Sequence, residues 1–74
     1  MLRPGIYRHA KSGQLYRVHY VAKHSETGED LVVYETLYAN PVAKFWVRPL
    51  TMFQEIVEIR GERTLRFVFV DEHA

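Results

Sequence analysis

The 74-residue sequence contains no cysteine, which excludes disulfide bonds, zinc ribbons and thiol catalysis. It has no apolar run approaching the roughly 18 residues that a membrane helix requires, and its first residues, M-L-R-P-G-I-Y, lack the apolar core of a signal peptide. Common catalytic motifs are also missing, since there is no G-x-S-x-G, no H-E-x-x-H and no P-loop. We therefore expect a cytoplasmic protein without a membrane partner, and catalysis is the less favoured class of function.

The sequence also lacks a large excess of positive or negative charge. The formal net charge is only +1 at pH 7, which is too small for a strong electrostatic attraction to nucleic acid. The charges are nevertheless unevenly distributed, because residues 1–25 contain basic side chains and no acid, whereas residues 26–35 contain acids and no base. One end of the chain is therefore locally basic.

Apolar and aromatic side chains are abundant instead. The sequence is 47% hydrophobic and 14% aromatic, which is far from the composition of a disordered segment. A chain of this length forms one domain, and a domain this small needs nearly all of its large side chains for its core or an interface. We expect a single folded domain over residues 1–74.

Period-two patterns predict strands along most of the chain. Residues 14–22 alternate, with one cleaner apolar face that carries Tyr16, Val18, Tyr20 and Ala22. Residues 31–38 are apolar on both faces and rich in β-branched and aromatic types, which is typical of a central strand. Further strands are predicted over 5–10 and 43–48, and a last hairpin over 56–59 and 65–70.

The turn signals between these segments predict the fold class. Turns recur about every ten residues, and only residues 49–55 suit a helical turn, with proline at its start. Five to six short strands of this kind favour a small SH3-like antiparallel β-barrel with one short helical turn. Closing the sheet would remove the exposed edges that a domain of this size cannot otherwise cover.

The stretch H-S-E-T-G-E, residues 24–29, lies between two predicted strands and has two readings. His24, Glu26 and Glu29 are metal-ligand types, but a metal centre needs three or four converging ligands and a second shell that fixes them. The simpler interpretation is a hairpin turn built around Gly28. We predict the turn, no bound metal, and a ligand-binding contribution from His24 and Glu26.

The run K-F-W-V-R-P, residues 44–49, also has two interpretations. Trp46 shares a face with Lys44 and Arg48, so it points outward between two cations if Phe45 and Val47 fill the core. Outward aromatic residues beside arginine are typical of sites that stack on bases or peptides. Alternatively, Trp46 is the main core residue of the barrel.

Five blocks of the sequence together resemble a known family. The chain is similar to the small bacterial family called domain of unknown function 1653, and the resemblance covers nearly all of it. It implies an SH3-like barrel and no assigned activity. The matching blocks are G-x-Y-R-H-x-K at 5–11, A-K-H-S-E-T-G-E at 22–29, L-V-V-Y-E-T-L-Y at 31–38, W-V-R-P-L-T-M-F at 46–53 and R-F at 66–67.

Three functions remain open on the sequence alone. The favoured hypothesis is a non-enzymatic binding module without a cofactor, whose aromatic and basic surface holds a peptide, a nucleotide or a short nucleic acid. One alternative is a metal-dependent or acid-base enzyme that uses the loop. Another is a structural homodimer joined through the edge near residues 43–48, so the protein is expected to be a monomer or a homodimer. The predicted ligand-binding residues are Arg8, His9, His24, Glu26, Tyr34, Trp46 and Arg48.

Overall fold

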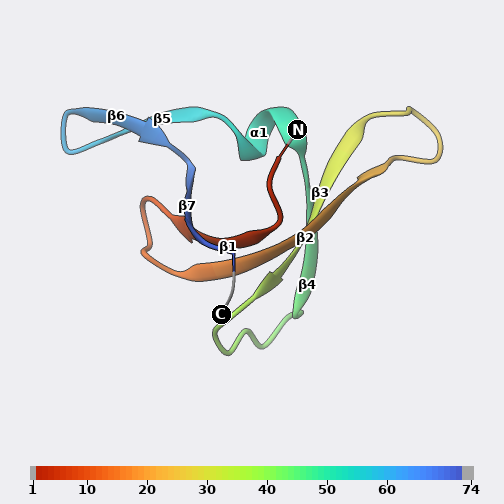
Figure 1. Cartoon of the computed structure of the whole chain (residues 1–74), viewed down its shortest axis with the longest axis horizontal. Helices are drawn as coiled ribbons and strands as arrows, with labels where there is room; N and C mark the ends of the chain where they lie inside the picture. Colours follow the sequence, from red (N-terminus) through yellow and green to blue (C-terminus); the bar gives the residue numbers. More distant parts are fainter. Residues whose placement is uncertain (1, 73–74) are drawn as a thin grey trace.

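The computed structural model describes residues 2–72 of the chain. Within this range, short strands and one helical turn follow one another along the chain (Figure 1). The all-β class and the short helix expected from the sequence are confirmed, and no helix in this range has the length and apolar character needed to cross a membrane. The elements are β1 (Gly5–His9), β2 (Leu15–Lys23), β3 (Asp30–Thr36), β4 (Phe45–Pro49), α1 (Leu50–Phe53), β5 (Ile56–Ile59), β6 (Glu62–Leu65) and β7 (Phe67–Asp71).

The strands form an open sheet with a separate hairpin. Five strands pair antiparallel in the order β4-β3-β2-β1-β7, and β5 pairs only with β6. The closed SH3-like barrel expected from the sequence is not confirmed, because β4 and β7 are the two edges of the sheet and do not pair with each other. In Figure 1 the β2–β3 and β5–β6 hairpins project toward opposite ends of the long axis.

The last third of the chain departs from the predicted hairpin of 56–59 with 65–70. The partner of β5 is β6, because Arg60 and Gly61 both adopt positive φ, 54° and 80°, and close a tight two-residue turn. After Arg66 the chain leaves the hairpin, and β7 pairs with β1. There Gly5 is required, since a Cβ atom on it would lie 2.6 Å from the carbonyl oxygen of Asp71.

A bulge in β2 changes the predicted alternation of that strand. The register of β2 against β3 shifts by one residue between Val18 and Tyr20, which makes His19 an inserted residue. One inserted residue exchanges the two faces of everything beyond it. Val21 therefore packs against the core, whereas Tyr20 is 61% exposed, and the prediction that Val18 and Tyr20 share a face is wrong.

The core is built around two stacked phenylalanine rings. Phe53 of α1 lies parallel to Phe67 of β7, with ring centroids 4.1 Å apart and an interplanar angle of 3°. Tyr7 and Tyr34 meet the Phe53 ring edge-on at 5.5 and 5.6 Å, and Phe53 is only 1% exposed. Val18 and Val32 complete the buried cluster. A four-residue helix is therefore held by the burial of one side chain.

The register of β4 places Trp46 on the core side of the sheet. Trp46 pairs with Tyr34, whose side chain is buried, and Arg48 lies two residues further on the same face. Phe45 and Val47 lie on the outer face and are 58% and 59% exposed. The arrangement in which these two fill the core and Trp46 points outward is therefore wrong, and Trp46 packs half-buried against the core.

The inserted His19 forms a hydrogen bond with Glu35 on the outer face. Its Nε2 donates to the Glu35 carboxylate at 2.7 Å, and the Lys44 ammonium lies 3.3 Å from the other carboxylate oxygen. The hydrogen bond from His19, together with Lys44, lowers the pKa of Glu35 below its usual 4.5. The charged form of Glu35 is therefore favoured by folding.

Replacing Phe53 by alanine should destabilise the domain by about 3–5 kcal/mol, because the change removes one ring of the central stack and leaves a cavity. The matched control is Phe45→Ala on the exposed outer face, where we expect a loss of about 1 kcal/mol or less. Urea unfolding followed by circular dichroism measures both. Equal losses in the two variants would contradict this description of the core.

Glu35 should make the stability depend on pH on the acid side. A carboxyl group whose pKa is lower in the folded state stabilises it above the unfolded pKa, and this contribution is lost as the pH falls below about 4.5. Urea unfolding of the wild type and of Glu35→Gln between pH 3 and 7 should therefore show a shallower decline in the variant. Parallel curves for the two proteins would refute the ion pair.

Candidate functional site

A small cavity on the core side of the sheet gathers three of the predicted ligand-binding residues. It has a volume of about 190 Å³ and lies where β2, β3 and β4 meet the loop after β3. Tyr34, Trp46 and Arg48, which were predicted from the sequence, therefore share one concave surface. We call this cavity the tyrosine pocket; it is lined by Tyr16, Tyr34, Tyr38, Asn40, Trp46 and Arg48.

Hydrogen bonds and ring contacts fix the walls of the tyrosine pocket. The hydroxyls of Tyr16 and Tyr38 share a hydrogen bond of 2.8 Å, and their rings meet edge-on at 5.5 Å. Arg48 Nε donates to the Tyr34 hydroxyl at 3.4 Å. Trp46 Nε1 donates to the backbone carbonyl of Ala43, just before β4, at 3.2 Å. The aromatic rings are therefore held in place before any ligand arrives.

The tyrosine pocket presents donors and no acid. Within the described chain, no carboxylate lines it and Arg48 forms no ion pair. Asn40 uses its Oδ1 to accept the backbone N–H of Val42, which leaves its amide N–H groups as donors. Burial, and then the hydrogen bond with Tyr38, raise the pKa of Tyr16, so its hydroxyl stays protonated. Such a lining suits a planar ligand that carries an anionic group.

A second cavity, of about 200 Å³, lies between the β1–β2 turn and β5. His9, one of the predicted ligand-binding residues, lines this cavity. Its ring meets the Phe67 ring edge-on, with the ring centroids 5.0 Å apart. Burial, and then the positive charge of Arg48, lower the pKa of His9, and its Nδ1 accepts the backbone N–H of Ser12 at 3.2 Å. We call this cavity the hairpin pocket; its lining is His9, Lys11, Val57, Glu58, Ile59 and Arg66.

The predicted pair His24 and Glu26 lies away from both pockets. The β2–β3 turn follows the Lys23–Asp30 pair, whereas the tyrosine pocket lies toward the other end of β3, about 13 Å along the strand from Asp30 to Tyr34. His24 closes the turn itself, since its Nδ1 accepts the backbone N–H groups of Glu26 and residue 27 at 3.1 and 3.3 Å. His24 and Glu26 therefore do not share the cavity that carries Trp46 and Arg48.

No metal centre is formed by these residues. Across residues 2–72 there is no group of three or more His, Asp or Glu side chains that could hold a metal ion. Glu26 is exposed and His24 is occupied with the backbone of its own turn. The loop is thus explained by turn formation alone.

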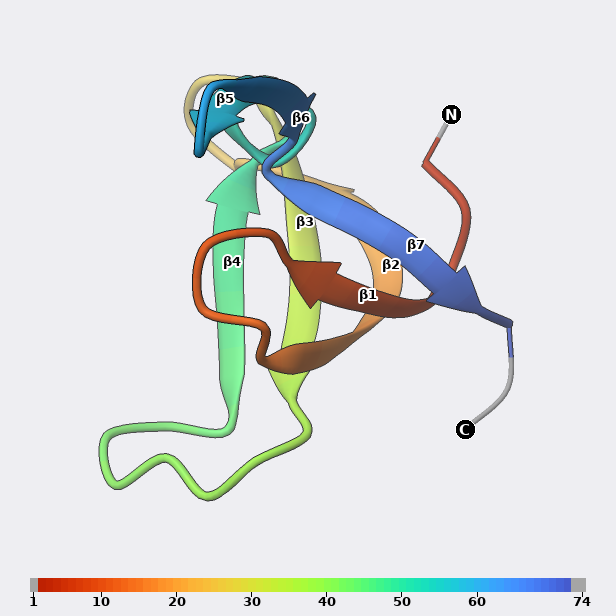
Figure 2. The ribbon, with the colours of Figure 1, turned by 90° about the vertical axis from the view of Figure 1, so that its left-hand side faces the viewer.

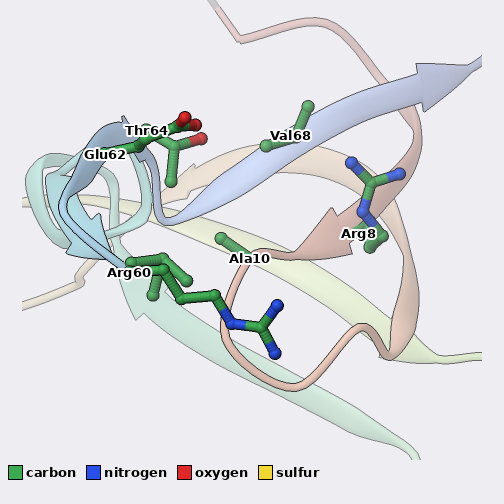
Figure 3. A pocket seen from close by; sticks show the side chains of 7 residues that line it. Arg8, Ala10, Arg60, Glu62, Thr64 and Val68 are labelled. Atoms are coloured by element: carbon green, nitrogen blue, oxygen red, sulfur yellow. The ribbon is translucent and has the colours of Figure 1, made fainter.

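Arg8 lines a third and larger cavity, of about 360 Å³, on the outer side of β1 (Figure 3). Arg60 reaches this cavity from the β5–β6 turn, but in Figure 3 the two guanidinium groups lie on different sides of Ala10 and do not point at each other. The carboxylate of Glu62 also lines it. Arg8 is therefore separate from Trp46 and Arg48, with which it was grouped from the sequence.

Three residues of the tyrosine pocket were missed from the sequence. Tyr16 lies in an apolar strand, where a tyrosine is indistinguishable from a core residue, and Asn40 lies in a predicted turn. Tyr38 belongs to the strand predicted over 31–38, but β3 ends at Thr36. Its position just beyond the strand end is what lets it fold over the cavity, and the A-N-P turn signal at 39–41 was the available indication.

Comparison with known proteins agrees with the fold. A crystal structure of a DUF1653 protein from Bordetella bronchiseptica superposes with a TM-score of 0.91 at 37% sequence identity, over 99% of this chain and 91% of the other. No curated protein matches the chain. The family model described as a protein of unknown function, DUF1653, matches residues 5–69. The chain therefore belongs to the DUF1653 family.

Proposed function

We propose that this protein is a non-enzymatic binding module whose tyrosine pocket takes the base of a nucleotide, with the phosphate held by Arg48. The observation that carries this proposal is the convergence of Trp46, Tyr34 and Arg48 on one cavity, in whose lining residues 2–72 place no carboxylate. Aromatic side chains stack on any base, and a guanidinium that lacks an ion pair binds a phosphate through charge-assisted hydrogen bonds. Neither interaction requires a catalytic residue.

The size and polarity of the pocket favour a nucleotide over a peptide. A volume of about 190 Å³ is below the range of about 300–1,000 Å³ that encloses whole drug-sized ligands, so it suits one planar group. The atoms that line it are mainly polar, whereas proline-rich peptides dock on apolar aromatic grooves. The phosphate of a nucleotide also gives Arg48 a partner of opposite charge.

A second candidate function is self-association through the outer face of β4. β4 is an edge strand, and Phe45 and Val47 expose apolar surface beside the equally exposed Tyr20. Two copies could pair these edges and extend the sheet. Light scattering over a concentration series tests this: a dimer that Val47→Lys abolishes supports it, and a monomer at all concentrations excludes it.

Nucleotide binding can be followed through Trp46, which is the only tryptophan in the chain. We expect AMP to quench its fluorescence and to bind more tightly than adenosine. Arg48→Gln should weaken AMP binding about tenfold or more, because a hydrogen bond to a charged group contributes about 1.5–3 kcal/mol. It should also remove the difference between AMP and adenosine and lower the salt dependence.

The matched control is Arg17→Gln, which makes the same change of charge on a residue that lines none of these pockets. It should bind AMP like the wild type. Thermal unfolding of both variants excludes a loss of folding as the cause. If millimolar concentrations of AMP, GMP, CMP and UMP change neither the Trp46 fluorescence nor the melting temperature, the proposal is refuted.

A further inference from the structure

One residue of the tyrosine pocket and one residue of the hairpin pocket contact the same aromatic ring. The guanidinium carbon of Arg48 lies 5.4 Å from the centre of the Phe67 ring, and the His9 ring lies 5.0 Å from the same ring. Arg48 lines the tyrosine pocket and His9 lines the hairpin pocket. Phe67, which is buried and lines neither cavity, therefore connects a wall residue of one cavity to a wall residue of the other.

Three cations lie near His9, two of them in the lining of the hairpin pocket and one in that of the tyrosine pocket. Arg48, Arg66 and Lys11 all lie close enough to His9 to disfavour its protonation. Arg66 is neutralised by an ion pair with Glu55. In the described part of the chain, Arg48 and Lys11 form no ion pair, so these two cations remain for a bound anion.

The two cavities are alike in size but differ in their walls. Their volumes are about 190 and 200 Å³, so each suits one planar group. The hairpin pocket offers the apolar side chains of Val57 and Ile59, and Glu58 also lines it. Figures 1 and 2 both show β5 above the β1–β2 turn. Together the two pockets therefore offer two sites for flat groups, the cations Arg48 and Lys11, and one acid, Glu58.

We propose that the ligand is a short single-stranded oligonucleotide whose two consecutive bases occupy the two pockets. The first base stacks in the tyrosine pocket, the linking phosphate lies over Arg48 and Lys11, and the second base packs against Val57 and Ile59. A further phosphate beyond the second base would meet Glu58 and is not favoured. This inference rests on the proposed function, because it extends the same site.

The test compares AMP, the dinucleotide ApA and the tetranucleotide of adenosine by titration against Trp46 fluorescence. ApA should bind about tenfold more tightly than AMP, since one additional stacked base contributes about 1–3 kcal/mol, equivalent to about 5- to 150-fold. The tetranucleotide should bind no more than about threefold more tightly than ApA, which is the statistical factor for three overlapping dinucleotides within four bases.

Two lysine variants separate a specific contact from a general charge effect. Lys11→Gln should bring the ratio of the AMP and ApA dissociation constants toward one, because it removes a cation from the linking phosphate. Lys23→Gln removes the same charge from the β2–β3 hairpin, where Lys23 pairs with Asp30, and should leave the wild-type ratio. Lys11 is an exposed turn residue, so both variants are expected to fold.

The outcomes distinguish this inference from the proposed function. If AMP binds and ApA binds equally well, the two-base site is refuted while the nucleotide site stands. If affinity continues to rise steeply with each added nucleotide, the protein binds through a nonspecific cationic surface and the two-base site is refuted. If no nucleotide binds but an acidic peptide quenches Trp46, both proposals are wrong and the pocket serves a peptide.

Discussion

The stacking of Phe53 on Phe67 is the contact on which the rest of the structure depends. α1 contains four residues, far fewer than a helix needs to be stable alone, so its position is set by burial of the Phe53 ring. That position directs the chain into the β5–β6 hairpin. Phe67 in turn supports Arg48 and His9, and both candidate pockets border these residues. One aromatic pair thus determines the core and the geometry of the site.

The sequence predicts where the strands lie better than which way their side chains point. β-branched and aromatic runs and the turn signals located most strands to within two residues, because these properties are local. The face of the sheet toward which a side chain points depends on how its strand pairs with other strands, and neighbouring residues in the sequence do not determine it. The bulge at His19 has no marker in the sequence, and the inward side of β4 follows from its pairing with Tyr34. Likewise, the separate pairing of β7 with β1 could not be read from residues 56–70.

The candidate site, like the fold, could be predicted only in part from the sequence. Tyr34, Trp46 and Arg48 could be grouped because aromatic residues flanked by arginine are typical of stacking sites, and the structure places them in one cavity. The imidazole of His24 accepts backbone N–H groups of its own turn, a role that has the same sequence signature as ligand binding. The tyrosines that complete the pocket are hidden among apolar strand residues, which makes tyrosine the hardest residue type to assign here.

The pairing of β1 with β7 has a consequence for how the domain can be connected to other chains. Ile6 pairs with Asp71, and Arg3 forms an ion pair with Glu72, so residues near the two ends of the chain are neighbours in space. A short peptide could join them without disturbing the sheet, and the exposed turn at 24–29 could then be opened. The domain is therefore suited to circular permutation and to insertion as a compact unit within a loop of another protein.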